Sequence, residues 1–280
     1  MRRHPFQQLD VFTDQPLQGN PLAVVLEADD LDEQRMAALA NWTNLSETAF
    51  LLQPTDPRAD YRVRIFTTLK ELPFAGHPTL GACHAWLQSG GVAKGREIIQ
   101  QCGIGLVRIR RDGELLAFTA PPLLRAGPLG PALLEQLIAA LGLTDDQVLD
   151  ARWVDNGAGW VALRLASREQ VLAVTPDFSR ILGMAVGVFA AWQAESAEGP
   201  ASFEVRAFVG GDGMPEDPVT GSLNAGIARW LLEEGLAPDR YLVSQGTALG
   251  RNGRVHVQRI GEDIWVGGAC VTCIEGQISL

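Results

Sequence analysis

Two segments of the chain are apolar on almost every side when they are arranged as helices, and they constrain the fold more than any other feature. They are residues 79–87 and 222–231, and each ends in a Trp-Leu pair. A helix without a polar face is buried on all sides. Strand-like segments precede and follow both helices, so we expect each helix to be the centre of its own sheet.

The surroundings of the two helices repeat along the chain. Each helix follows a series of strands and a loop of small residues, which indicates an α+β protein with two pseudo-duplicated domains, each with a sheet wrapped around a central helix. Pro121-Pro122 ends the first series and is the best boundary. We predict an N-terminal domain at residues 1–121, to which a C-terminal strand at about 266–280 could return, and a C-terminal domain at residues 122–265.

Shorter patterns predict the local elements. Asp30 and Glu33 form a capping box, which predicts a helix with Met36, Leu39 and Ala40 on one face. Further helices are expected at residues 78–87, near 176–182 and at about 221–234. Strands are expected at residues 48–52, 61–66, 98–101, 106–109, 115–119, 160–165, 186–192, 203–208, 254–260 and 264–274.

The charge and the hydropathy of the chain disfavour several kinds of partner. A net charge of −10 repels phosphate backbones, so we expect no nucleic-acid partner. The longest apolar runs, such as residues 21–26, are too short to cross a bilayer. The two arginines near the N-terminus are not followed by the apolar segment of a signal peptide. We therefore expect a cytoplasmic protein that does not bind membranes.

Metal and nucleotide motifs are weak in this sequence. Cys270 and Cys273 have the spacing of half a metal or redox site, but residues three apart on a regular strand point to opposite faces, and no second ligand pair has suitable spacing. Gly103-Ile104-Gly105 lacks the third glycine of a dinucleotide-binding motif. We expect no metal and no cofactor.

Glu47 is the first residue with a plausible chemical role. It follows Asn44-Leu45-Ser46 and precedes a strongly apolar strand. A carboxylate beside such a strand would be partly desolvated, which raises its pKa and suits it to acid/base chemistry near neutrality. The alternative is an exposed glutamate at the edge of a strand, and the local sequence by itself favours that alternative.

Polar loops precede both apolar helices. His77 lies just before the first helix, whose free N–H groups could bind a carboxylate and would lower the pKa of His77. Glu216-Asp217-Pro218-Val219-Thr220-Gly221-Ser222 occupies the equivalent place before the second. The two helix starts could face each other across a cleft between domains, where small ligands commonly bind. Alternatively, His77 only caps its helix and both loops are ordinary turns.

Together these segments resemble the PhzF family of phenazine-biosynthesis isomerases, in order and spacing over essentially the whole chain. The matching motifs are Asp10-Val11-Phe12-Thr13 with Gly19-Asn20-Pro21-Leu22-Ala23-Val24-Val25, Asn44-Leu45-Ser46-Glu47-Thr48, Phe74-Ala75-Gly76-His77-Pro78-Thr79 and Glu216-Asp217-Pro218-Val219-Thr220-Gly221-Ser222. The resemblance implies the diaminopimelate-epimerase fold, with an active site between two similar domains, and a homodimer.

The resemblance also implies roles for single residues. Glu47 is expected to be the main acid/base group, with His77 and Asp217 as further catalytic residues. Residues expected to bind the substrate are Asn20, Ser46, Gly76, Thr79, Gly221 and Ser222. Diaminopimelate epimerases carry a catalytic cysteine at each of two helix starts. Here Gly76 and Asp217 stand in those places, which excludes a two-thiol mechanism.

The expected function is therefore a cofactor-independent isomerase that moves a proton on a small, unsaturated or cyclic carboxylate. The resemblance points to a dihydro-hydroxyanthranilate-like acid. Two alternatives remain open: a non-catalytic protein that binds small metabolites on the same fold, and an amino-acid epimerase.

Overall fold

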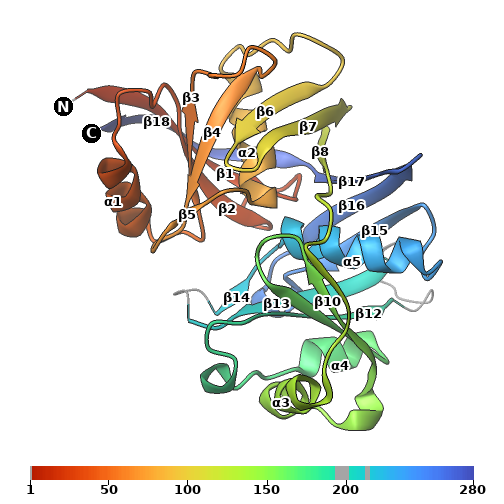
Figure 1. Cartoon of the computed structure of the whole chain (residues 1–280). Coiled ribbons are helices and arrows are strands. Elements are labelled where there is room, and N and C mark those ends of the chain that lie inside the picture. Colours follow the sequence, from red (N-terminus) through yellow and green to blue (C-terminus); the bar gives the residue numbers. More distant parts are fainter. Residues whose placement is uncertain (1, 193–201, 212–214) are drawn as a thin grey trace. The chain divides into compact units, whose positions relative to one another are not determined.

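The chain divides into two compact units, which are described separately (Figure 1). The computed structural model describes residues 2–192, 202–211 and 215–280. Unit 1 comprises Met1–Thr119 and Gly267–Leu280, and unit 2 comprises Ala120–Val266.

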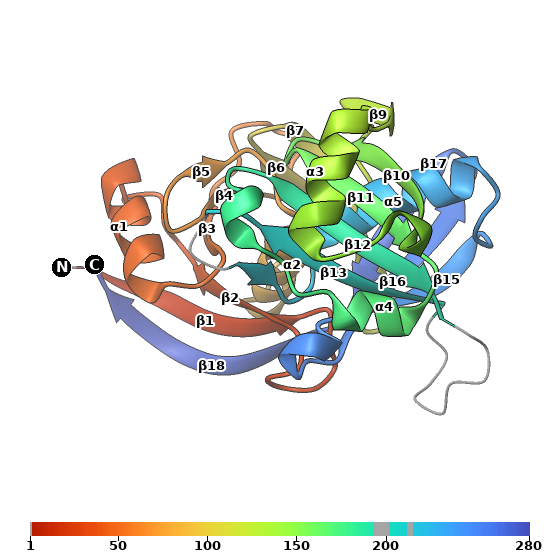
Figure 2. The ribbon, with the colours of Figure 1, turned by 90° about the horizontal axis from the view of Figure 1, so that it is seen from below.

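Unit 1 is a mixed sheet around one helix. Its strands are β1 (Arg3–Val11), β2 (Asn20–Val25), β3 (Thr48–Leu52), β4 (Tyr61–Phe66), β5 (Glu71–Leu72), β6 (Ile98–Cys102), β7 (Gly105–Asp112), β8 (Leu115–Thr119) and β18 (Cys270–Ser279). Pairing runs from β18 through β1, β2, β3, β4, β6 and β7 to β8, and β5 adds a short antiparallel pair to β4. The β2–β3 and β4–β6 pairs are parallel. The two ends of the chain meet beside β1 and β18, where the Arg2 N–H donates to Leu280 O at 2.7 Å (Figure 2).

The helix α2 (Gly76–Gln88) is the centre of unit 1, whereas α1 (Glu33–Thr43) lies between β2 and β3 in the chain. α2 packs against β1, β2, β3, β4 and β8, and its residues from Gly76 to Cys83 are buried. A Cβ at Gly81 would come within 2.4 Å of Leu22 Cδ2, so the helix can approach β2 this closely because the position is glycine. The burial predicted for this apolar helix is confirmed.

Unit 2 has the same order of pairings. Its strands are β9 (Arg125–Pro128), β10 (Val148–Asp155), β11 (Trp160–Leu165), β12 (Ala185–Ala191), β13 (Phe203–Val209), β14 (Glu216–Asp217), β15 (Arg240–Gln245) and β16 (Gly253–Ile260), and β17 (Asp263–Gly268) crosses from unit 2 into unit 1. Pairing runs from β9 through β10, β11, β12, β13 and β15 to β16, with β14 on β13. The β11–β12 and β13–β15 pairs are parallel.

Helices cover both faces of the sheet in unit 2. Residues of α3 (Pro131–Leu141) and α4 (Arg168–Ala173) share a hydrophobic core with Val186 and Val188 of β12. The third helix, α5 (Gly221–Glu233), packs Leu223 onto Gly187, where a Cβ would come within 2.6 Å of Leu223 Cδ1. Because successive residues of a strand face opposite sides, α5 lies on the face opposite α3 and α4, as Figure 2 also shows.

Some local predictions are wrong for identifiable reasons. The first helix is capped by Asp32, whose Oδ1 accepts from the Arg35 N–H at 2.8 Å, and not by Asp30, whose carboxylate lies 3.4 Å from Arg2. The strand expected at residues 264–274 is two strands, β17 and β18, separated at Ala269.

The argument that placed Cys270 and Cys273 on opposite faces of a regular strand also fails. Gln8 pairs with Ile274 and Leu9 with Thr272, so Cys273 is an extra residue at a β-bulge, and the bulge breaks the alternation. Both cysteines are free. Across residues 2–192, 202–211 and 215–280, no three His, Cys, Asp or Glu side chains gather as a metal site.

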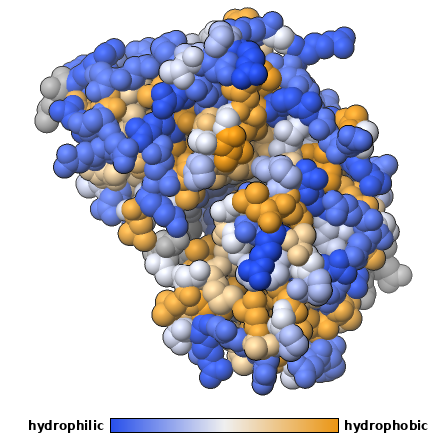
Figure 3. All heavy atoms as spheres, viewed as in Figure 1, coloured by the Kyte–Doolittle hydropathy of each residue, from blue (hydrophilic) through white to orange (hydrophobic). Residues whose placement is uncertain are grey.

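The surface of the molecule is mostly hydrophilic on the face shown in Figure 3, where hydrophobic residues form separate clusters. Large apolar side chains that are exposed include Trp42 on α1, at 78%, and Val92, at 82%. Among the described residues, no helix is both long enough and apolar enough to cross a membrane.

Candidate active site

Glu47 sits at the end of a tight connection between α1 and β3. The helix ends at Thr43, and Asn44 adopts a left-handed conformation (φ 55°) that turns the chain towards β3. The hydroxyls of Thr43 and Thr48 lie 3.2 Å apart and tie the two ends of this connection together. The Glu47 side chain is only 16% exposed, so it is not the exposed strand-edge glutamate that the local sequence favours.

His77 is the partner of Glu47. It is the second residue of α2, and its Nε2 lies 3.5 Å from Glu47 Oε2. Its Nδ1 lies 3.3 Å from Asn20 Nδ2 at the start of β2. An amide nitrogen can only donate, so Nδ1 accepts this hydrogen bond and the ring proton is on Nε2. Nε2 lies beside the Glu47 carboxylate, but the two atoms are not hydrogen-bonded to each other in this state.

Burial determines the charge of this histidine. His77 is 3% exposed, and its desolvation lowers the pKa from 6.5 to about 3. The imidazole is therefore neutral near pH 7, in agreement with the direction expected from the sequence. The cause differs, because the sequence argument invoked the positive end of the helix whereas the pKa shift arises from burial.

Asp10 holds Asn20 in place through the backbone. The Gly19 N–H donates to Asp10 Oδ2 at 3.0 Å, and Asp10 is only 2% exposed. A Cβ at Gly19 would come within 2.2 Å of Val11 O, so this tight passage requires glycine. Asp10 belongs to a motif that the sequence singled out, but its role as the anchor of Gly19 and Asn20 could not be read from the motif.

In unit 2, Asp217 lies on the short strand β14. The preceding residue, Glu216, accepts two hydrogen bonds of 2.8 Å from Arg206 of β13, and Arg206 also donates to the carbonyl oxygen of Val174 just after α4. Arg206 is 7% exposed and was missed by sequence reasoning, since nothing local marks its partners. This ion pair fixes β14, and with it Asp217.

Ser222 is held at the start of α5. Its Oγ accepts from Trp160 Nε1 at 2.9 Å, and its carbonyl oxygen accepts from Asn156 Nδ2 at 2.8 Å. Since Oγ already accepts from the indole, the hydroxyl retains its own proton as a donor. Neither Ala75, which precedes α2, nor Thr220, which precedes α5, caps its helix with a side chain, so the N–H groups of both first turns are suited to binding an anion.

The structure brings some of the predicted residues together. Asn20, His77 and Glu47 form one cluster in unit 1. Thr79 is fully buried beneath it, and its hydroxyl oxygen accepts from Gln100 Nε2 at 3.0 Å. Ser46 is half-buried beside Glu47, and Gly76 begins α2.

Asp217 does not stand at a helix start. It lies on β14, four residues before Gly221, the first residue of α5. The segments before α2 and α5 have the same arrangement. Each begins with a glutamate, Glu71 or Glu216, that pairs with an arginine of the preceding strand. Each ends five residues later with the glycine that begins the helix, Gly76 in α2 and Gly221 in α5. Gly76 therefore corresponds to Gly221, and Asp217 corresponds to Leu72.

The buried thiol of Cys83 is unsuited to catalysis. It lies in the middle of α2 with no exposed surface, and burial raises its pKa to about 12. A thiol in this state is protonated near neutrality and is a poor nucleophile or base.

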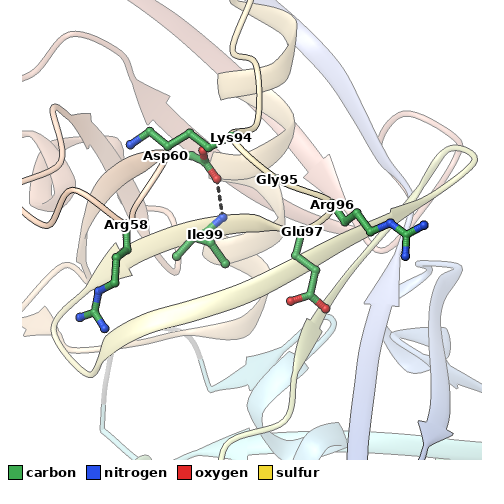
Figure 4. Close-up of a pocket in the computed structure, with 7 residues that line it drawn as sticks. All are labelled: Arg58, Asp60, Lys94, Gly95, Arg96, Glu97 and Ile99. Carbon is green, nitrogen blue, oxygen red and sulfur yellow. Dashed lines mark hydrogen bonds between the residues drawn. The ribbon is translucent and has the colours of Figure 1, made fainter.

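A hollow elsewhere in unit 1 is lined by several cationic side chains. It measures about 460 Å³ and is lined by Arg58, Asp60, Lys94, Gly95, Arg96, Glu97 and Ile99 (Figure 4). Arg58 and Arg96 lie at opposite ends of it. Lys94 Nζ already donates to the carbonyl oxygen of Pro57 at 3.1 Å, and Arg58 pairs with Asp56 at 2.7 Å. Lys94 and Arg58 are thus already engaged, and Arg58 and Arg96 extend in different directions, so these cations do not gather around one point (Figure 4).

Comparisons with known proteins identify the family of the chain. Antisense-enhancing sequence 1 of Schizosaccharomyces pombe is 34% identical, with 99% of each chain covered. The trans-2,3-dihydro-3-hydroxyanthranilate isomerase of Pseudomonas aeruginosa is 32% identical, with 92% of this chain and 91% of the relative covered. A crystal structure of a PhzF-family phenazine biosynthesis protein from Enterococcus faecalis is similar over 100% of both chains, with a TM-score of 0.81 and 25% identity. The model of the PhzC-PhzF family, described as phenazine biosynthesis-like protein, matches residues 9–276, and the chain therefore belongs to this family, whose relatives include named isomerases.

Proposed function

We propose that this protein is an isomerase in which Glu47 removes a proton from a carbon of a small carboxylate and returns it to another carbon. The observation that carries the proposal is the neutral, buried His77, whose Nε2 lies 3.5 Å from Glu47 Oε2 while Asn20 holds Nδ1. An N–H this close to the carboxylate can become its donor when the substrate binds, because catalytic hydrogen bonds often tighten only in the complex. The 32% identity to a trans-2,3-dihydro-3-hydroxyanthranilate isomerase supports a cyclic, unsaturated acid as the substrate.

Residues of unit 2 also have roles in this proposal. Asp217 is a further acid/base group, the Ser222 hydroxyl is a donor suited to a carboxylate, and so are the N–H groups at Gly76 in unit 1 and at Gly221 in unit 2. The equal order of strand pairings supports two copies of one structural motif. Of the two copies, one supplies Glu47 and the other supplies Asp217.

Three further features complete the proposal: the absence of a cofactor, the location in the cell and the oligomeric state. The reaction uses no cofactor, because a carboxylic acid can perform both proton transfers. The protein acts in the cytoplasm as a homodimer, and exposed apolar side chains such as Trp42 are candidates for the contact between subunits. Sedimentation at micromolar concentration is expected to return a dimer, and a monomer would remove this part of the proposal.

The test of the reaction is Glu47→Gln. With trans-2,3-dihydro-3-hydroxyanthranilate in deuterated water, the wild-type protein should form the isomerised product, and deuterium should enter it to the extent that the Glu47 carboxyl group exchanges with solvent before the proton is returned. Loss of general acid/base catalysis should slow turnover by about 100- to 10,000-fold. Glu114→Gln is the matched control, because the Glu114 side chain is 91% exposed. Near-wild-type turnover by a folded Glu47→Gln protein would refute the role of Glu47. A ligand that binds without being isomerised and without any isotope exchange would favour a non-catalytic binding protein.

A further inference from the structure

Gln245, at the end of β15, is buried beneath the start of α5 and makes four hydrogen bonds. Its Oε1 accepts from the Thr220 N–H at 3.0 Å and from Asn224 Nδ2 at 2.8 Å. Its Nε2 donates to Asp217 O at 3.1 Å and to Thr220 Oγ1 at 3.0 Å. A backbone N–H can only donate and a backbone carbonyl can only accept, so these two contacts fix which end of the amide is oxygen.

The fixed amide determines the direction of the next hydrogen bond. Because Gln245 Nε2 donates to Thr220 Oγ1, the Thr220 hydroxyl has to direct its own proton elsewhere. Its other partner is Asp217 Oδ2, at 2.5 Å. This distance is typical of a hydroxyl that donates to a carboxylate. Asp217 Oδ2 is therefore an acceptor, and any proton that the carboxyl group carries is on Oδ1.

We propose that Thr220 and Gln245 are positioning residues that orient the Asp217 carboxyl group through its Oδ2 and favour its ionised form. This inference rests on the proposed function, in which Asp217 acts on the substrate. Gln245 fixes the Thr220 hydroxyl, and the hydroxyl holds Oδ2 as an acceptor.

Unit 1 provides an internal comparison. The strand β6, which corresponds to β15, also provides a buried amide two residues before the counterpart of Gln245: Gln100 Nε2 donates to Thr79 Oγ1 of the central helix at 3.0 Å. The positions that correspond to Thr220 and Asp217 are Ala75 and Leu72, which have no polar side-chain atoms. The same hairpin and helix start thus form without a hydroxyl–carboxylate pair. The pair in unit 2 is therefore not a requirement of the fold, and it is found where a functional carboxylate is proposed.

The test follows the titration of Asp217 by carbon-13 NMR of its side-chain carboxyl group, with the signal assigned by its loss in Asp217→Asn. Thr220→Val removes the hydroxyl and keeps the volume. Because a hydrogen bond to the charged form is lost, the titration midpoint should rise by about 1 to 2 pH units. Thr220→Ser should restore the wild-type midpoint, and Thr175→Val, at an exposed position, should leave it unchanged.

The possible outcomes separate this inference from the proposed function. A raised midpoint in Thr220→Val with rescue by Thr220→Ser supports the positioning role. An unchanged midpoint in a natively folded Thr220→Val protein overturns it. The titration needs no substrate, so its failure leaves the role of Glu47 intact. An active Glu47→Gln protein, in contrast, refutes the proposed function without affecting the titration.

Discussion

His77 Nε2 lies 3.5 Å from Glu47 Oε2, and the histidine is neutral because it is buried. The contact is thus between a neutral N–H and a carboxyl group and not between two opposite charges. A neutral N–H at this distance can become a donor to Glu47 on substrate binding without holding the carboxyl group permanently in its ionised form, which suits a group that has to accept a proton and then release it.

Replacing His77 should therefore slow the reaction more than it weakens binding. His77→Phe keeps a buried ring but removes the N–H that lies beside Glu47, and we expect kcat to fall by about 100-fold with a smaller change in KM. His84→Phe is the matched control on the same helix, since His84 Nε2 contacts Thr272 and not Glu47. Equal kcat values for the two variants would contradict the role of His77.

The free energy of unfolding should depend on pH in the way that the lowered pKa of His77 requires. Above pH 6.5, His77 is neutral in both the folded and the unfolded chain. Between pH 6.5 and about 3, the unfolded chain binds a proton that the folded protein excludes, so the free energy of unfolding decreases as the pH falls. From pH 7 to pH 5 the wild type should lose about 2 kcal/mol more than His77→Phe. Urea unfolding at both pH values measures this difference, and parallel pH profiles would contradict the assignment.

Asp10 should stabilise the cluster of Asn20, His77 and Glu47 through its hydrogen bond with the Gly19 N–H. Asp10→Ala leaves the buried Gly19 N–H without its acceptor, which should cost about 1 to 3 kcal/mol in the free energy of unfolding and reduce activity through Asn20. Asp14→Ala, at an exposed position in the following loop, is the control. If urea unfolding gives both variants the same free energy of unfolding, the Asp10–Gly19 hydrogen bond does not contribute the predicted stability.

Thiol reagents should leave the reaction intact. The high pKa and full burial of Cys83 predict slow alkylation in the folded protein, with activity retained after the accessible thiols of Cys102 and Cys273 have reacted. Mass spectrometry after timed exposure to iodoacetamide measures the modification of each cysteine. Inactivation that follows the alkylation of Cys83 would support the alternative function, a thiol-dependent epimerase.

Much of the local structure could be predicted because it depends on near neighbours in the sequence. The bounds of β3 and β4 agree with the prediction, and the two apolar helices are buried as their composition requires. The cap of α1 was wrong because the capping-box pattern favours Asp30, with Glu33 three residues later, whereas Asp32 is followed by Arg35 and meets only the general preference for Asp at this position. The choice between them depends on where the chain leaves β2, which is a tertiary property.

The supporting residues of the site could not be predicted in the same way. Gln245 lies 25 residues after Thr220 and Arg206 lies 10 residues before Glu216, and neither belongs to a motif. Their importance comes from parallel and antiparallel strand pairing, which brings β15 and β14 beside β13. A sequence pattern can identify Asp217 as a candidate, but the side chains that orient it become visible only in the folded chain.

The type of ligand can be tested without knowledge of the natural substrate. The helix starts at Gly76 and Gly221 and the hydroxyl of Ser222 are donors suited to a carboxylate, despite the net charge of −10. In a thermal-shift series of cyclic acids with matched amides and amines, an acid at one hundred times its Kd should raise Tm by roughly 5 to 10 °C. Ser222→Ala should reduce this shift, whereas Ser179→Ala, on the surface of unit 2, should not. Stabilisation by amides or amines but by none of the acids would overturn the proposal, because donors arranged for an anion have no reason to prefer a neutral or cationic group.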